Sequence, residues 1–374
     1  MAVVTGITLR HIKMPLIKPY RLSYRTFDVF EPYLVEVHDD AGRRGYGDGH
    51  ISPGSSAETR DGGWAHLVSL ADAALGKSPA EAKALALARF EDSKVATTAF
   101  VTALEVLEAS PLLEVPRDTS LPLLTPIGAL EERDIQAEVA AALAQGFRTF
   151  KVKVGQDPEA DATRVARIQR AAGRQATLRL DANRAFSRDD AIRFAKALVP
   201  VDIALFEQPC AAEDWAANAA VAAASPVPVM LDEPICALDD IERAAEIENV
   251  GFLKLKLKRF GSLERLLEGL ERTRALGMAP VLGDGLGSEL QAWLEACVAA
   301  RTIDNAGEFN GFLKPNERLF RTPLPFAAGS IELPRGYRPE LDWARVERLT
   351  ARRRDFGDVA ALEHATVGSP VHGA

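Results

Sequence analysis

The sequence predicts an α/β protein, a (β/α)₈-type barrel preceded by an α+β capping domain. From about residue 121 onward, short apolar runs alternate with helical stretches, which is typical of a parallel sheet. The runs recur eight times, which favours a closed barrel over an open sheet. The 374 residues exceed the roughly 250 of a typical barrel, and most of the surplus precedes Leu121. We therefore expect a cap over residues 1–118, a barrel over 119–320, and a C-terminal segment over 321–374 that packs on the cap or the barrel.

The expected cap contains strands followed by helices. Residues 3–14 and 33–39 mix apolar and polar positions as strands do, and Asp40-Ala41-Gly42 is a turn signal before a returning strand. A loop is expected over residues 17–30. The predicted helices cover residues 57–75 and 79–109.

The barrel elements follow in a regular order. The eight predicted strands are residues 121–127, 149–155, 177–183, 203–208, 227–233, 251–256, 279–283 and about 306–311. A helix over residues 130–145 is closed by Gly146, a residue suited to a helix C-terminus. The Arg-rich residues 345–354 are predicted to form a solvated helix face.

Composition narrows the possible functions. Apolar residues make up 47% of the chain and charged residues 26%, which is ordinary for a globular protein. The net charge of −8, with no basic stripe, argues against nucleic-acid binding. No apolar stretch approaches the roughly 20 residues needed to span a membrane, and no secretory signal is visible. Cys210, Cys236 and Cys297 are odd in number and lack metal-type spacing, so a cytoplasmic location is expected.

Charged residues stand at the ends of the predicted strands. Side chains two apart on a strand point the same way, so Lys151 and Lys153 share a face. The same holds for Asp181 with Asn183, and for the pair two apart on the sixth strand. Burying an isolated charge is costly, so the groups must compensate one another. The full set is Lys151, Lys153, Asp181, Asn183, Glu207, Asp232, Glu233, Lys254 and Lys256.

Two kinds of chemistry fit this set. Hard oxygen ligands on three successive strands, Asp181, Glu207 and Asp232, suit Mg²⁺, and no His or Cys cluster competes for a softer metal. The predicted barrel holds no histidine, so acid/base work falls to other side chains. A lysine beside cations can become a base near neutral pH. Lys153 and Lys256 would approach from opposite sides, which suits removal of a proton from one face and its return to the other. A purely structural set of ion pairs at the barrel rim is the competing interpretation.

These residues resemble the enolase superfamily and, within it, the muconate-lactonizing-enzyme-like subgroup of the mandelate racemase/muconate lactonizing enzyme family. The resemblance spans about residues 4–319. Its motifs are Pro19-Tyr20-Arg21-Leu22-Ser23, Lys151-x-Lys153, Asp181-x-Asn183, Glu207-Gln208-Pro209, Asp232-Glu233-Pro234, and Lys256 followed by Gly261-Ser262.

The resemblance implies roles for individual residues. It implies that Asp181, Glu207 and Asp232 bind one Mg²⁺ per subunit. It implies that Lys153 and Lys256 are the acid/base pair, and that Lys151 neutralises the substrate carboxylate. The shared step in the family is removal of the proton α to a carboxylate, which gives an enediolate. The implied substrate contacts are Arg21, Tyr24, Asn183, Glu308 and Asn310.

The chain also departs from the family pattern. Asp48 stands where the family often has Glu, and the seventh strand ends in the Gly-rich residues 283–289, whose role is open. Dipeptide epimerases of the subgroup hold a substrate ammonium with two aspartates on the eighth strand. Here the corresponding residues are Glu308 and Asn310, which argues against dipeptide epimerase activity. His50 could reach substrate, although a surface position is expected.

The expected function is that of a Mg²⁺-dependent racemase or epimerase of a small carboxylate, such as an N-modified amino acid. A muconate-type cycloisomerase or a syn-dehydratase like o-succinylbenzoate synthase could use the same lysines. A non-catalytic barrel that binds a metal or ligand is a third hypothesis. The expected partners are a small-molecule carboxylate and further copies of the chain in a homo-oligomer, with neither nucleic acid nor membrane.

Overall fold

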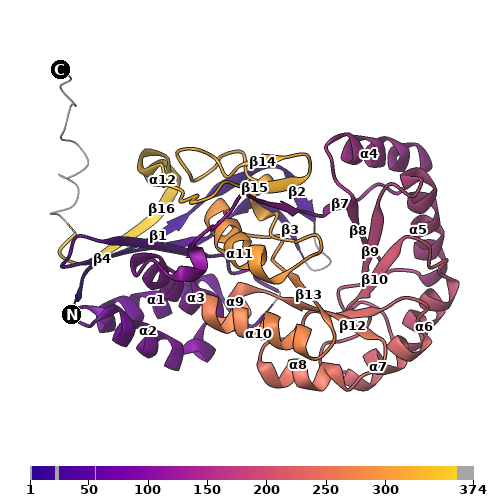
Figure 1. The fold of residues 1–374 in the computed structure, drawn as a ribbon, viewed down its shortest axis with the longest axis horizontal. Helices are drawn as coiled ribbons and strands as arrows, with labels where there is room; N and C mark the ends of the chain where they lie inside the picture. The colour runs from indigo at the N-terminus through magenta and orange to yellow at the C-terminus, as the bar shows by residue number, and fades with distance from the viewer. Residues whose placement is uncertain (1, 22–24, 55, 360–374) are drawn as a thin grey trace.

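The computed structural model describes residues 2–21, 25–54 and 56–359 (Figure 1). An antiparallel sheet with helices beneath it lies at one end of the molecule, and a curved parallel sheet ringed by helices lies at the other. This arrangement confirms the predicted α/β barrel with an N-terminal capping region. Within the described residues, no helix is long and apolar enough to cross a membrane.

The cap is built on a four-stranded antiparallel sheet in the order β16-β1-β4-β5. Its strands and helices are β1 (Val4–Ile12), β4 (Tyr33–Asp39), β5 (Arg44–Gly49), β16 (Thr350–Gly357), α1 (Arg60–Ala74), α2 (Pro79–Ala88) and α3 (Lys94–Leu107). Alternate positions of β5 are glycines, because α3 packs directly on that face. A Cβ at Gly45 would lie 2.1 Å from the carbonyl oxygen of Ala103, and one at Gly47 would lie 2.3 Å from Thr102 Oγ1. The sequence of β5 thus allows the helix to approach the sheet closely.

Two cap predictions were wrong in detail. The expected loop over residues 17–30 instead contains most of β2 (Met14–Arg21) and all of β3 (Thr26–Phe30), which pair antiparallel. Only Met14 and Leu16 are buried in β2, so the apolar alternation that marks a strand covers only its start. The expected helix over residues 79–109 is divided into α2 and α3 by a short 3₁₀ turn at Phe90–Asp92.

The barrel contains a seven-stranded parallel sheet in the order β13-β12-β11-β10-β9-β8-β7. Its strands are β7 (Thr125–Ile127), β8 (Thr149–Lys153), β9 (Thr177–Asp181), β10 (Ile203–Glu207), β11 (Val229–Leu231), β12 (Val250–Leu255) and β13 (Ala279–Leu282). The helices are α4 (Glu132–Ala144), α5 (Pro158–Ala172), α6 (Arg188–Ala197), α7 (Trp215–Ala224), α8 (Leu238–Ala245), α9 (Leu257–Phe260), α10 (Leu263–Ala275) and α11 (Glu289–Thr302). Helices α4 to α8 form the outer layer around the strands (Figure 1).

The ring is closed by a short extended segment instead of a full eighth strand. The backbone of Gly307 donates to the Pro122 carbonyl at 2.8 Å and accepts from Leu124 at 3.1 Å. On its other side, Glu308 donates to the Leu282 carbonyl at 2.9 Å. The predicted eighth strand over 306–311 is therefore reduced to the residues around Gly307. The first predicted strand, 121–127, is also divided, because β6 (Thr119–Pro122) pairs with β15 (Ser330–Leu333) in a separate sheet.

The C-terminal segment contacts both halves of the molecule. β14 (Phe326–Ala327) and β15 join β6, and α12 (Trp343–Leu349) leads into β16, which pairs antiparallel with β1. The Arg-rich residues 345–354 are thus partly α12 and partly β16, so the prediction of one helix face was wrong. Much of β16 is exposed, which accommodates its arginines.

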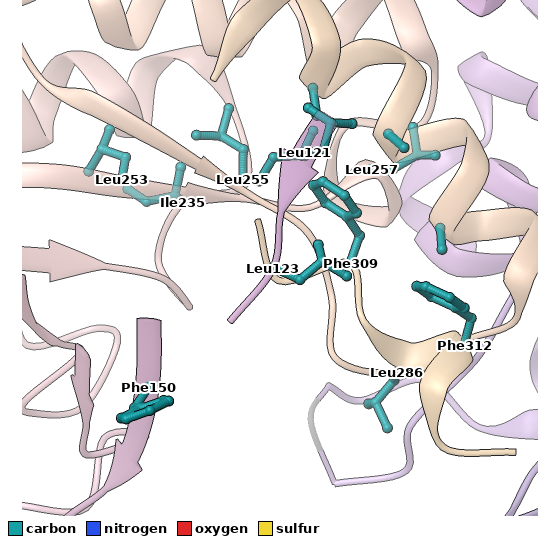
Figure 2. Close-up of a cluster of buried hydrophobic side chains, with 14 of the residues drawn as sticks. Leu121, Leu123, Phe150, Ile235, Leu253, Leu255, Leu257, Leu286, Phe309 and Phe312 are labelled. Carbon is teal, nitrogen blue, oxygen red and sulfur yellow. The ribbon is translucent and has the colours of Figure 1, made fainter. Parts of the chain in front are cut away.

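A large apolar core links the barrel to its closing segment (Figure 2). Phe309 and Phe312 are each 1% exposed. Gly283 follows β13 with a φ of +121°, and a Cβ there would lie 2.4 Å from the backbone nitrogen of Phe309. The end of β13 and the closing segment are therefore packed too tightly for a side chain at this position. The cap has its own apolar cluster, which includes Leu9, Val35 and Phe100.

Candidate active site

Strand register brings three carboxylates, which we call the carboxylate row, to one end of the barrel. Lys153 on β8 is in register with Asp181 on β9, and Asp181 is in register with Glu207 on β10. Asp232 follows β11, two residues beyond Met230, the register partner of Glu207. The row is Asp181, Glu207 and Asp232. Their exposed fractions are 0%, 0% and 2%, so all three charges need compensation.

Lys151 lies at the centre of this compensation. Its Nζ is 2.9 Å from Asp181 Oδ2, 2.9 Å from Glu207 Oε2 and 2.7 Å from Glu308 Oε1. Burial lowers the pKa of Lys151, but the ionised Asp181 and Glu207 raise it more, so the net pKa is raised. Lys151 is therefore a fixed positive charge at neutral pH.

Lys153 and Lys256 hold the two ends of the row. Lys153 Nζ is 2.5 Å from Asp181 Oδ2 and also contacts Asn183 Oδ1. Lys256 Nζ is 2.9 Å from Asp232 Oδ2. Burial raises the pKa of both aspartates, but the neighbouring lysines, with Arg259 beside Asp232, more than offset it, so both pKa values are lowered. Both carboxylates are thus ionised at neutral pH.

Both lysines face one cavity of about 350 Å³. Lys153 ends β8 and Lys256 follows β12, four places apart in the strand order of the barrel sheet. In a ring of eight positions, four places are half a turn. The two amines therefore reach the cavity from opposite sides.

Several residues of this site were not singled out from the sequence. Arg259 Nη1 is 2.8 Å from Asp232 Oδ1, one helical turn after Lys256. Lys258 pairs with Asp284, and both line the cavity. The run of alternate lysines at 254, 256 and 258 is the signal that could have pointed to Lys258. Gln208, to which the sequence motif assigned no role, accepts a hydrogen bond from the Asp232 backbone at 2.9 Å and so helps to position the row.

The structure brings together some of the predicted substrate residues and not others. Asn183 and Glu308 line the cavity. Asn310 is buried and does not line the cavity; it donates to the Leu124 carbonyl at 2.9 Å. Arg21 is exposed at the end of β2, and the adjacent Tyr20 lines the cavity instead, together with residues of the cap between 56 and 95. Tyr24 lies outside the described residues.

Two further expectations concern the Gly-rich residues and His50. Asp284, Gly285 and Leu286 line the cavity, so the middle of the Gly-rich segment forms part of its wall. The surface position expected for His50 was wrong, since its exposed fraction is 1%. Its ring centroid lies 5.1 Å from that of Phe30. Burial lowers the pKa of His50 to about 3, so this ring is neutral in the folded protein.

The carboxylate row has the chemistry of a magnesium site. In the described part of the chain, no group of three or more His, Cys, Asp or Glu side chains is already arranged around a common metal position. Instead, Lys151, Lys153 and Lys256 contact the row. Buried, ionised carboxylates on adjacent strands are hard ligands that need a cation, and Mg²⁺ accepts a few such ligands together with water or substrate. The donor set therefore fits this ion.

Fold and site together define a capped (β/α)₈ barrel with a lysine- and carboxylate-lined mouth, and comparison with known proteins gives its family. Residues 134–339, more than half of the chain, match the family described as "Enolase C-terminal domain-like", and the chain belongs to this family. It is 28% identical to muconate cycloisomerase 1-2 from Acinetobacter lwoffii over 377 residues, covering 94% of this chain and 95% of that protein. It is 25% identical to L-Ala-D/L-Glu epimerase from Bacillus subtilis (strain 168) over 356 residues, covering 88% and 94%.

A solved structure agrees with this placement. The dipeptide epimerase from Cytophaga hutchinsonii, complexed with Mg and the dipeptide D-Ala-L-Val, aligns with a TM-score of 0.86. The alignment covers 94% of this chain and 99% of that chain at 24% identity, and shows the shared fold. Within the enolase superfamily, the chain falls in the muconate-lactonizing-enzyme-like subgroup, as its motifs predicted. It is an enzyme of the isomerase class.

Proposed function

We propose that the protein is a magnesium-dependent racemase or epimerase that removes and returns the proton α to the carboxylate of a small acid. The observation that carries this proposal is the opposed placement of Lys153 and Lys256 around one cavity. In a two-base inversion, one group takes the proton from one face of the carbon and another supplies a proton to the opposite face. A cavity with an amine on each side offers both groups.

The three lysines of the site have different roles in this reaction. In one direction the neutral amine of Lys153 takes the α-proton at Nζ, and the ammonium of Lys256 delivers a proton to the other face; the reverse reaction exchanges these roles. Lys151, held by Glu207 and Glu308, supplies a permanent positive charge for the substrate carboxylate. The intermediate is an enediolate, whose negative charge this lysine helps to stabilise.

We assign one Mg²⁺ per subunit to Asp181, Glu207 and Asp232. Their burial at adjacent strand ends supports the assignment, as does the Mg in the Cytophaga dipeptide epimerase of the same fold. When bound, this ion supplies Lewis-acid stabilisation of the carboxylate charge that develops as the proton leaves. Lys153 and Lys256, which now contact two of these carboxylates, are then free to face the substrate.

Deuterium exchange tests the proposal directly. The Mg²⁺-loaded protein is incubated in D₂O with a panel of small carboxylates, including N-acylated amino acids, and loss of the α-proton signal is followed by ¹H NMR. We expect exchange together with inversion, seen as loss of optical rotation. A folded, Mg²⁺-binding protein that exchanges no acid in the panel would rule the proposal out.

A cycloisomerase is the second candidate, favoured by the 28% identity to a muconate cycloisomerase over most of both chains. That reaction, like a syn-dehydration, can use one lysine as the base and the other for electrostatic support. Product analysis separates the three reactions. A racemase changes only chirality, a cycloisomerase forms a ring without a change of mass, and a dehydratase loses water. The third hypothesis is a barrel that binds a metal or ligand without catalysis. It requires only the carboxylates and gives no role to Lys153 and Lys256.

We place this reaction in the cytoplasm, in a homo-oligomer. The three cysteines are unpaired, which fits a reducing compartment. Resemblance to a family whose members often form dimers or octamers supports the oligomer. Size-exclusion chromatography with light scattering measures the assembly directly.

A further inference from the structure

We propose that Lys254 is a specificity-determining residue. Because it forms an ion pair with Glu308, this carboxylate cannot bind a substrate whose nitrogen is a free ammonium group. The inference rests on the proposed function and narrows its substrate class. The preferred substrates are carboxylates whose nitrogen is acylated, or which have no amine. Lys254 acts through Glu308 and is therefore a positioning residue.

Both carboxylate oxygens of Glu308 are already engaged by lysines. Oε1 lies 2.7 Å from Lys151 Nζ, and Oε2 contacts Lys254 Nζ. Glu308 itself lines the cavity, whereas Lys254 is 0% exposed behind it. A substrate ammonium that approached Glu308 would have to displace a buried lysine, and a buried amine that loses its partner is costly.

Lys254 lies near one other carboxylate, Glu207, which we also assign to the metal site. Its Nζ is 3.5 Å from Glu207 Oε1. Glu207 belongs to the carboxylate row that we assign to Mg²⁺, and a carboxylate shared with a divalent cation attracts a lysine less strongly. Glu308 is therefore the principal counter-ion of Lys254 in the working enzyme.

Other acids of the cavity wall are also engaged. Asp284 pairs with Lys258, and Glu233 Oε1 lies 3.3 Å from Arg184 Nε. Glu58 accepts from the backbone nitrogen of Val95 at 3.1 Å. Asp284 and Glu58, like Glu308, would have to give up a contact to receive an ammonium group. By contrast, Glu233 Oε2 is buried without a hydrogen-bond partner among the described residues.

The cationic side of the wall adds to the selection. Lys151, Lys153, Lys256 and Lys258 all line the cavity. An ammonium group that enters loses its water and meets like charges, whereas an amide nitrogen carries no charge and loses far less. The wall therefore discriminates against the charged nitrogen itself and tolerates the same carbon skeleton once the nitrogen is acylated.

Matched ligand pairs test the inference by binding, independently of turnover. Isothermal titration calorimetry of the Mg²⁺-loaded protein uses L-leucine with N-acetyl-L-leucine, and the equivalent alanine and phenylalanine pairs. We expect at least one acetylated acid to bind at least tenfold more tightly than its free amine. Preference for the free amine, or binding of neither member of any pair, overturns the inference.

Variants of Lys254 test whether this residue causes the preference for the acetylated acids. Lys254→Met frees Glu308 Oε2, so the preference for the acetylated acid should fall at least tenfold, whereas Lys254→Arg keeps a cation there and should preserve it. Lys83→Met is the matched control, since Lys83 also pairs with a buried acid, Glu105, at 3.0 Å but lies outside the cavity wall. An unchanged preference in folded Lys254→Met overturns the assignment. If that variant does not fold, loss of the preference in Lys254→Arg overturns it instead.

Deuterium exchange with the same pairs separates the two proposals. An acylated acid that binds with the expected preference but never exchanges its α-proton removes the racemase and leaves the selectivity intact. Exchange that is faster with the free amines supports the racemase and removes the role of Lys254.

Discussion

Two sides of the barrel mouth carry buried acids held by lysines, but they are built differently. The carboxylate row stands on strands in regular parallel register. On what we call the closing side, Asp284 and Glu308 follow β13 and the short segment around Gly307, where only a few backbone hydrogen bonds complete the ring. In the row, Asp181 and Asp232 contact the two opposed lysines, and Glu207 contacts Lys151. The acids of the closing side pair with Lys258 and Lys254. The regular side thus fits the reaction, and the irregular side fits the choice of substrate.

The largest effect is expected from the lysines beside the row. Lys153→Ala and Lys256→Ala should each reduce racemisation by about 10²–10⁴-fold, the usual contribution of a general acid or base. Each variant should still exchange the α-proton of one enantiomer, because one base remains. Chiral chromatography and NMR in D₂O measure both rates. If one lysine could be removed without loss of turnover, the one-base alternatives would be favoured.

Packing of the closing side should contribute strongly to stability. Phe309→Ala removes a side chain that is 1% exposed beside Glu308, and should lower the free energy of unfolding by about 3–5 kcal/mol. Leu130→Ala is the control, because Leu130 is 66% exposed and should change that free energy by no more than about 0.5 kcal/mol. Urea denaturation followed by circular dichroism gives both values. Equal effects would show that the closing segment is not a packed part of the barrel.

Magnesium should distinguish the two sides. At about 100 times its Kd, Mg²⁺ should stabilise the wild-type protein by about 2.7 kcal/mol, seen as a rise in Tm. Asp232→Asn should lose most of this rise. Asp284→Asn, which changes a buried acid on the closing side, should keep it. A rise that disappears in Asp284→Asn but survives in Asp232→Asn would move the metal from the row to the closing side.

The smallest expected effect is a pH dependence of stability that arises from Glu295, a buried acid near Asp284. Burial, with the charge of Asp284, raises the pKa of Glu295 to about 8. The unfolded chain loses this proton near the ordinary pKa of about 4.3, whereas the folded protein keeps it, so stability falls between about pH 4 and pH 8. Glu295→Gln should remove that part of the fall while keeping the shape of the side chain. Thermal melts from pH 5 to pH 8.5 measure the slope, and an identical slope in the variant would contradict this account.

The carboxylate row could be predicted because local sequence determines it. Asp181 and Glu207 each end an apolar run, and strand periodicity fixes the direction of their side chains. The cavity-facing residues of the cap loop were harder to predict, because the local sequence there carries little information. Tyr20 and Arg21 are adjacent and face opposite ways, and with only two buried residues in β2 the sequence does not reveal which one faces the cavity.

Long-range contacts explain the other differences between sequence and structure. β6 separates from the predicted first barrel strand because its partner is β15, about 210 residues later. The pairing of Lys254 with Glu308 depends on how the ring closes, which no local pattern records. His50 follows a cap strand in a polar setting, and its burial results from packing against β3.

The pairing of β16 with β1 affects the order in which the chain folds during synthesis. β1 is among the first segments to leave the ribosome. Its neighbour on one side, β4, follows soon after, but its other neighbour, β16, is made only after the whole barrel has been translated. Until then one edge of β1 has no strand beside it, and such an edge can pair with other chains. A nascent or truncated chain that ends before residue 350 therefore has an unpaired, aggregation-prone strand edge near its N-terminus. Pairing of β16 with β1 covers this edge once the last strand has been made.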